Sequence, residues 1–325
     1  LAAKQLPKHI DISEKDRLRI SRQNKSSLET GMRAQAEKET RGTPITLVSG
    51  KIKGLCIVID FPDQPGMVPL AEFNAFCNDS NYNGYGNKGS LRTYYRDISG
   101  GIVDYENVVF GYYHAPHTFS YYDSLPYAQG ARMILDSALH WIAAQGFDFS
   151  TLSLNPDNTI RAINMMYTGV PLNWAQGMWH HKGSYSGFTA NGVRSKDYNC
   201  SPANEPLRIA VVAHENGHMI GKWPDTYKYT NDHGDDGIGT FDLMCWPGND
   251  QTNPVPPNPL FRSNAGWGKV IDITGFNGIN FDTANAMTCY RYINMNDTNE
   301  MFLIENRLKK NRSQQIEDQG LTIWH

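Results

Sequence analysis

The sequence feature that most constrains the fold is an H-E-x-x-H pattern formed by His214, Glu215 and His218. On an α-helix, residues four positions apart lie one turn apart on the same face, so both imidazoles can face one metal ion. Glu215 can then reach a water molecule on that ion, which is the arrangement of a two-histidine zinc site with a glutamate as general base. We therefore expect a helix at about 206–220 with this face directed at a site.

Three fixed letters out of five also occur by chance, but the flanking residues favour a real helix. An apolar run that can bury it precedes the motif: Leu207, Ile209, Val211 and Val212. After the motif, Gly221 can adopt the left-handed conformation that ends a helix, and Pro224 cannot easily continue one. Asp225 follows directly and is the candidate third ligand.

Composition argues against two classes of partner. The 325 residues carry a net charge of -3 and no basic-aromatic RNA-binding motif, so we expect no nucleic-acid partner. No apolar run approaches the roughly 20 residues of a membrane span. Residues 1–5 do not form a signal peptide, but they are compatible with what is left after one has been removed.

The five cysteines leave the redox state open. None lies in a C-x-x-C pair, which argues against a thiolate zinc site: Cys56, Cys77, Cys200, Cys245 and Cys289. Two disulfides and one free thiol would fit an exported protein, and reduced buried cysteines fit about as well. The disulfide pairing cannot be deduced from the sequence.

Residues 1–44 differ in composition from the rest of the chain. They are charged and helix-prone, with few large apolar side chains, so they cannot build a core of their own. We interpret this segment as a propeptide or an N-terminal arm on the main domain, and a disordered leader explains its composition equally well. Whether it inhibits the protein, as in a zymogen, stays open.

Residues 45–325 combine strand and helix patterns. Strands are predicted from a buried apolar run at 54–61 and from segments at 101–110, 162–167 and, as a short edge strand, 176–182. Helices are predicted at 70–77, at 89–98 with Ser90 as a cap, and at 127–145. The last would bury one face made of Ala131, Ile134, Leu135, Ala138, Leu139 and Ile142.

This order predicts an α+β fold with two parts. The upper part, about 45–221, would hold a mixed sheet with helices packed on it, including the helix of the H-E-x-x-H motif. The lower part, about 222–325, would be smaller and rich in loops, with short strands from 270 onward. The cleft would run between the two parts.

Several stretches together resemble the immune inhibitor A family of secreted zinc metallopeptidases. They are IVIDFPD at 57–63, GSLRTYYRDIS at 89–99, the motif helix with PDTY at 224–227, GTFDLM at 239–244, and FLIENR at 302–307 with GLTIWH at 320–325. The likeness covers about residues 50–325. It implies a metzincin-like zinc peptidase fold, in which an acidic third ligand follows H-E-x-x-H-x-x-G and a methionine lies under the metal.

The resemblance also implies a role for individual residues. Zinc would be held by His214, His218 and Asp225, with Glu215 as the general base, and Met244 would form the Met-turn beneath the metal. An ordinary core methionine is the alternative for Met244.

The spacing of the third ligand departs from the family pattern. Many members place this aspartate six residues after the second histidine, whereas Asp225 comes seven residues after His218. Because the extra residue falls in a turn, the carboxylate can still arrive. Asp235, Asp236 and Asp242 are the fallback candidates.

Other polar residues near the motif have weaker signals. Tyr227 and Tyr229 could supply a phenol to the oxyanion, although surface packing explains them at least as well. His180 and His181 are not expected to be ligands, since a satisfied structural histidine is commoner. Members of the family often carry calcium, so one Ca²⁺ site is expected among loop carboxylates: Asp60, Asp63, Asp232, Asp235, Asp236 and Asp242.

The expected function is that of a secreted, monomeric zinc metalloendopeptidase acting on protein or peptide substrates. One alternative is a catalytically silent binding or adhesion module. Another is a zinc hydrolase of a different class, such as an aminopeptidase. Cleavage specificity, the biological target and any further C-terminal domains cannot be deduced from the sequence.

Overall fold

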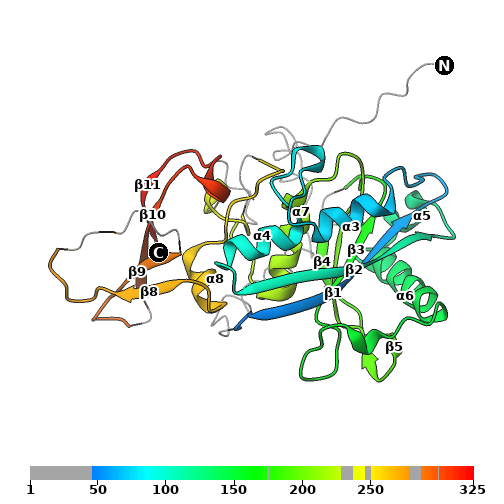
Figure 1. Ribbon diagram of the computed structural model, residues 1–325, viewed down its shortest axis with the longest axis horizontal. Coiled ribbons are helices and arrows are strands. Elements are labelled where there is room, and N and C mark those ends of the chain that lie inside the picture. The colour runs from blue at the N-terminus through cyan, green and yellow to red at the C-terminus, as the bar shows by residue number, and fades with distance from the viewer. Residues whose placement is uncertain are drawn as a thin grey trace, which may run out of the picture.

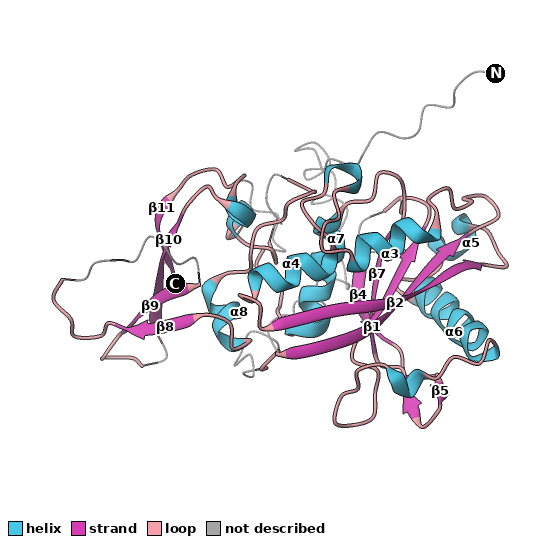
Figure 2. Cartoon of the chain, in the orientation of Figure 1, coloured by secondary structure: helices cyan, strands magenta, loops and turns pink. Residues whose placement is uncertain are grey.

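The chain folds into a mixed arrangement of helices and several β-sheets, seen in a computed structural model (Figure 1; Figure 2). The structure describes residues 46–173, 176–227, 237–245, 250–278, 281, 287–298 and 300–325. The segment interpreted as a propeptide or arm, 1–44, lies outside these residues. Among the helices described, none is both long and apolar enough to cross a membrane.

The central sheet is mixed and has the strand order β2-β1-β3-β7-β4. Its strands are β1 (Gly50–Asp60), β2 (Val103–His114), β3 (Ile163–Tyr167), β7 (Asp197–Pro202) and β4 (His181–Ser184). The first four run parallel, and β4 pairs antiparallel with β7 at the edge. The predicted buried strand at 54–61 is therefore confirmed as the core of β1. The predicted edge strand is confirmed too, although it begins at 181.

Helices cover both faces of this sheet. Their bounds are α3 (Leu70–Asn78), α4 (Leu91–Ile98), α5 (Phe119–Asp123), α6 (Gln129–Ala144) and α7 (Ile209–Asn216). The three predicted helices before the motif are confirmed as α3, α4 and α6. The side chain of Ser90 accepts a hydrogen bond from the backbone of Thr93, which is the cap predicted for α4.

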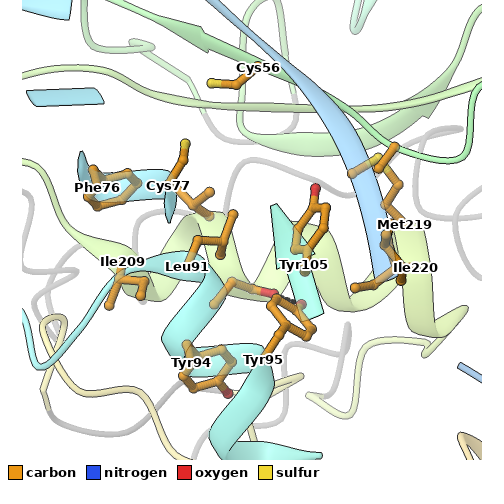
Figure 3. Packing of buried hydrophobic residues seen from close by; sticks show 14 of the residues in the cluster. Cys56, Phe76, Cys77, Leu91, Tyr94, Tyr95, Tyr105, Ile209, Met219 and Ile220 are labelled. Atoms are coloured by element: carbon orange, nitrogen blue, oxygen red, sulfur yellow. Dashed lines mark hydrogen bonds between the residues drawn. The ribbon is translucent and has the colours of Figure 1, made fainter. Parts of the chain in front are cut away.

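The alternation of side chains along β1 divides the core in two. Ile52, Cys56 and Val58 join a cluster with α3, α4 and α7, whereas Leu55 and Ile57 join a second cluster with α5 and α6. Figure 3 shows part of the first cluster, where residues of α4 and α7 lie together. The apolar face predicted for α6 is buried as expected.

A second sheet lies at the other end of the molecule (Figure 1). It has the order β11-β10-β9-β8, from β8 (Lys269–Asp272), β9 (Thr288–Ile293), β10 (Met301–Arg307) and β11 (Gly320–Trp324). The short strands predicted beyond 270 are thus confirmed. Helix α8 (Pro259–Asn264) precedes this sheet, and a buried ion pair joins them through Arg262 and Glu305.

Several elements were not predicted from the sequence. They are β7, the small hairpin of β5 (Thr189–Ala190) and β6 (Val193–Arg194), α5, and the 3-10 turns η1 (Gly84–Gly86), η2 (Phe149–Thr151), η4 (Gly239–Phe241) and η5 (Asn311–Ser313). All five cysteines are free and buried, so the structure agrees with the reduced alternative.

Candidate metal centre

Helix α7 carries His214 and Glu215 of the motif, His218 follows in the next turn, and hydrogen bonds hold α7 to neighbouring segments. It begins at Ile209, later than the expected 206, and its first turn is capped by Asn87 from a distant loop. The Asn87 side chain accepts from the Ile209 N–H at 3.2 Å and donates to the Leu207 carbonyl at 2.9 Å. The Tyr95 hydroxyl donates to the Ala213 carbonyl at 2.7 Å. These bonds fix the position of the helix just before His214.

The end of the motif helix differs from the prediction. After Asn216 the chain continues as one π-helical turn, η3 (Gly217–Gly221), and Lys222 then takes the left-handed conformation with φ 56°. The prediction that Gly221 has this conformation is wrong. Gly221 is instead needed for space, because a Cβ there would lie 2.5 Å from the Trp223 ring. A π turn contains one residue more than an α turn, so this ending accommodates the long spacing between His218 and Asp225.

The two histidines and Asp225 converge on one point. Nε2 of His214 lies 3.1 Å from Nε2 of His218. One oxygen of Asp225, Oδ1, lies 3.1 Å from each of these nitrogens. The three potential ligand atoms therefore form a triangle with equal sides.

Backbone carbonyls orient both imidazole rings. Nδ1 of His214 lies 2.9 Å from the Leu243 carbonyl oxygen, and Nδ1 of His218 lies 2.6 Å from that of Trp223. A hydrogen on each Nδ1 donates to the carbonyl, which leaves a lone pair on each Nε2 pointing at Asp225. This second layer of contacts is the usual way in which proteins fix a metal-binding histidine.

The electrostatics of the trio favour a positive charge at its centre. Burial alone would lower the pKa of His214, but Asp225 and Glu215 raise it to about 9. Burial would likewise lower the pKa of His218, and Asp225 raises it. Burial would raise the pKa of Asp225, yet the two histidines hold it far below its usual range. Near neutral pH, either protons on the histidines or a metal ion at the centre of the trio can supply this positive charge.

A zinc ion fits this donor set. Ligand atoms about 2.0–2.1 Å from a tetrahedral zinc ion lie about 3.3 Å apart, close to the 3.1 Å sides of the triangle. Two imidazole nitrogens and one carboxylate oxygen leave a fourth position for water or substrate, as in catalytic zinc sites. Within the residues that the structure describes, this is the one group of three or more His, Cys, Asp or Glu side chains close enough to hold a metal.

Glu215 is buried beside the trio. The backbone N–H of Lys182, in the edge strand β4, faces this carboxylate and favours its ionised form. Burial raises the pKa of Glu215, against the opposing effect of His214 and His218. A carboxylate whose pKa is raised accepts a proton more readily than an exposed one does, which is what a general base requires.

Met244 lies beneath the helix at the position between the two histidines. The thioether Sδ would be only 2.6 Å from a Cβ added at Gly217, so the methionine packs directly on the helix backbone there. The preceding residue, Leu243, supplies the carbonyl that orients His214. The segment that contains Met244 therefore supports the trio from below.

The fallback ligand Asp242 is fully engaged elsewhere. Its Oδ2 accepts from Thr226 Oγ1 at 2.8 Å and from Asn258 Nδ2 at 2.9 Å, and its Oδ1 accepts from the backbone of Met244 and Asn258. Asp242 thus holds together the loop after Asp225 and the Met244 segment. The other fallbacks, Asp235 and Asp236, lie outside the described residues.

The remaining candidate residues fall into different places. Tyr227 lies half-buried, two residues beyond Asp225, whereas Tyr229 is outside the described part of the chain. His181 is buried, with Nε2 at 2.9 Å from the Tyr198 hydroxyl, and burial lowers its pKa to about 4. His180 Nδ1 lies 3.2 Å from the Tyr167 hydroxyl. Both histidines have structural partners, as expected.

Tyr127 is a residue near the site that sequence reasoning missed. Its ring lies 5.0 Å from that of His181. Burial raises its pKa, and the negative charges of Glu215 and Asp225 add to the effect, which places its phenol within electrostatic reach of the trio. Tyr127 precedes α6 in a loop without any motif, so no signal in the sequence marks it.

The carboxylates proposed for calcium do not gather in the described residues. Asp60 accepts from the Gly66 backbone at 3.0 Å and contacts His114 Nδ1 at 2.6 Å. Asp63 accepts from the backbone of Phe119 at 2.6 Å. Asp232, Asp235 and Asp236 lie outside the described residues, so the expected calcium site stays a prediction.

Comparisons with known proteins leave the family unassigned. No family profile matches the chain, and no curated protein matches it either. The geometry of the site therefore has to carry the functional argument.

Proposed function

We propose that the chain is a zinc metalloendopeptidase with a metzincin-like site, similar to the immune inhibitor A family. The observation that carries this proposal is the triangle of ligand atoms from His214, His218 and Asp225, with 3.1 Å sides, next to the buried carboxylate of Glu215. The carboxylate of Asp225 reaches the two histidines although this residue lies one position further along the chain than in the family pattern. Met244 under the helix adds support.

The side chains of the site divide the chemistry between them. When bound, zinc would lower the pKa of water toward 7 and polarise the scissile carbonyl. Glu215 takes the proton of the attacking water and passes it to the leaving amine. The Lys182 N–H keeps the Glu215 carboxylate oriented for both transfers. Asp225 adds a negative charge that a third histidine would lack, which holds the metal more tightly.

The wider parts of the proposal depend on the resemblance. A secreted location, protein or peptide substrates and a calcium site follow from it. A monomeric state is proposed as well, and the composition of residues 1–44 adds a propeptide or an N-terminal arm.

Two other functions remain as outcomes of the test. A silent binding module would have no need for Glu215 beside an intact ligand trio. An aminopeptidase or another zinc hydrolase would share the metal chemistry but release single N-terminal residues, and its third ligand is usually a glutamate on a later helix.

The decisive experiment combines metal analysis with proteolysis. Purified wild type and Glu215→Gln are assayed for zinc and for cleavage of a denatured protein, with and without a chelator. We expect one zinc in both proteins and internal, chelator-sensitive cleavage by the wild type, reduced about 10²–10⁴-fold in Glu215→Gln. Zinc without cleavage would indicate the silent module, and release of N-terminal residues alone would indicate an aminopeptidase.

A further inference from the structure

A buried carboxylate, Asp197, lies at the start of β7 and faces two ammonium groups. Its Oδ2 is 2.5 Å from Nζ of Lys222, and its Oδ1 is 3.3 Å from Nζ of Lys182. Ser184 Oγ donates to the same Oδ1 at 3.0 Å. Asp197 is only 6% exposed. Burial acts to raise the pKa of Asp197, but Lys222 and Lys182 outweigh it and hold the pKa below its usual range.

Lys222 is the residue at which the chain leaves the motif helix. It has a positive φ of 56°, a left-handed conformation that is unfavourable for a non-glycine residue. Its Nζ also donates to the Met219 carbonyl at 2.8 Å, so one ammonium group closes the helix end and binds Asp197. These two contacts stabilise the left-handed turn that leads to Asp225.

Lys182 connects the same carboxylate to the other side of the site. Its side chain pairs with Asp197, while its backbone N–H faces the Glu215 carboxylate. It lies in β4, which is paired with β7 so that Ser184 is opposite Asp197. Asp197 therefore contacts both the turn that presents the third ligand and the strand that orients the general base.

We propose that Asp197 is a positioning residue of the metal centre, acting through Lys222 on the turn that presents Asp225 and through Lys182 on the strand that orients Glu215. This inference rests on the proposed function. It explains how a turn one residue longer than the family pattern still brings a carboxylate to the two histidines. Lys222, in the lengthened turn, would be held in place by an ion pair to β7, the strand next to the sheet edge.

The test uses variants that separate the ion pair from the backbone conformation. Lys222→Gly is compatible with the left-handed turn, which glycine adopts freely, and removes the side chain with its ammonium group. Lys222→Arg restores a cation at the same position. Asp197→Asn removes the charge from the other side. Lys196→Gln is the matched control, because it breaks the exposed ion pair of the neighbouring Lys196 with Asp157.

Each variant is measured for zinc affinity by chelator competition, for the visible spectrum of the cobalt-substituted protein, and for kcat and KM on a peptide. We expect Lys222→Gly and Asp197→Asn to lose about 10-fold or more in zinc affinity, the scale for residues that orient metal ligands. Their cobalt spectra should change, and kcat should fall more than KM rises. Lys222→Arg should recover most of the loss, and Lys196→Gln should match the wild type.

The inference is overturned if Lys222→Gly and Asp197→Asn match the wild type in all three measurements. It is also overturned if Lys196→Gln weakens zinc binding as much as they do. In both cases a wild type that binds zinc and cleaves peptide keeps the proposed function intact. A wild type that binds no zinc overturns the proposed function, and this inference with it.

Discussion

The two faces of the central sheet hold their helices by different means. On one face, α6 is bound by apolar side chains such as Ile134, Leu135 and Leu139, which are fully or almost fully buried. On the other face, α7 is bound by apolar contacts and also by a chain of buried amides and phenols. On the face of the candidate metal centre, the hydrogen bonds between α7 and the strands are fully buried. The α6 face has a bond from the half-buried Tyr185 to Asp136.

Asn164 in β3 is the centre of this buried network. Its Oδ1 accepts from Asn216 Nδ2 at 2.8 Å and from Asn199 Nδ2 of β7. Its Nδ2 donates to the Tyr105 hydroxyl at 2.7 Å, and that hydroxyl donates to Asn216 Oδ1 at 2.7 Å. Asn216 lies in the motif, directly after Glu215. The network therefore ties the end of the motif helix to three strands.

This difference indicates that holding a helix against the sheet and fixing the exact position of its side chains depend on different interactions. Apolar burial holds a helix against a sheet but tolerates small shifts, since it has no preferred direction. Buried hydrogen bonds are satisfied in one arrangement only, and they specify a unique geometry. A metal site needs that second property, because its ligand atoms must stay within tenths of an ångström.

The largest effect on stability is expected on the apolar face. Leu139→Ala leaves a cavity under α6 and should lower the free energy of unfolding by about 2–5 kcal/mol. The zinc affinity of the folded protein should not change, since α6 does not contact the trio. Denaturant unfolding and chelator competition measure the two quantities. Met133→Ala, at an exposed position of the same helix, is the control. A fall in the zinc affinity of Leu139→Ala would contradict the proposed difference between the two faces of the sheet.

A smaller loss of stability with a larger functional effect is expected on the polar face. Asn164→Ala leaves buried amides without partners and should cost about 1–3 kcal/mol. Because Asn216 loses one of its anchors, zinc affinity and kcat should fall as well. Compared with Leu139→Ala, Asn164→Ala should have a free energy of unfolding closer to that of the wild type. Its zinc affinity and kcat should be lower than those of Leu139→Ala. Unchanged zinc binding and turnover would show that the network has only a structural role.

Two glycines offer a matched pair. A Cβ at Gly130 in α6 would lie 2.5 Å from the Tyr122 backbone carbonyl, while a Cβ at Gly217 would meet the thioether of Met244 at 2.6 Å. Backbone yields less easily than a methionine side chain, so Gly130→Ala should cost more stability, about 1–3 kcal/mol. Gly217→Ala should instead displace Met244 and lower activity. Enzyme kinetics and thermal unfolding of both variants measure these effects. Equal activities of Gly130→Ala and Gly217→Ala would contradict the prediction.

The smallest effect is a pH dependence carried by Asp197. Its pKa is lower in the folded protein than in the unfolded chain, so its ionised form stabilises the fold above the unfolded pKa of about 4. This contribution is lost as the pH falls from there through the folded pKa. The stability difference between wild type and Asp197→Asn, both kept metal-free, should therefore be larger at pH 7 than at pH 3. A difference that is the same at both pH values would argue against the ion pairs.

The sequence was most informative where side chains alternate between apolar and polar. The face of α6 and the cap at Ser90 could be predicted because period and capping chemistry are local properties. Strand β7 was missed because its sequence, DYNCSP, is polar and still almost wholly buried. The buried Asn199 donates a hydrogen bond to Asn164 of β3, and Ser201 donates one to Asn199. The bond to Asn164 is a long-range contact, which a local sequence pattern does not reveal.

The candidate site shows the same division. The motif identifies His214, His218 and Glu215 because their spacing is local to one helix. The ending of that helix could not be predicted, since Gly221 is kept small by Trp223 and the left-handed residue is Lys222, which Asp197 holds from across the fold. Tyr127 carries no motif and is brought to the site by the tertiary structure alone.

The most direct test of the account is the zinc content of the purified protein after dialysis against a zinc buffer. The account predicts one zinc per chain for the wild type and for Glu215→Gln. It predicts a large loss for Asp225→Ala and for the double variant His214→Ala and His218→Ala, with each protein shown to be folded. Stoichiometric zinc in the double variant, or none in the folded wild type, would contradict the assignment of these three residues as the metal site.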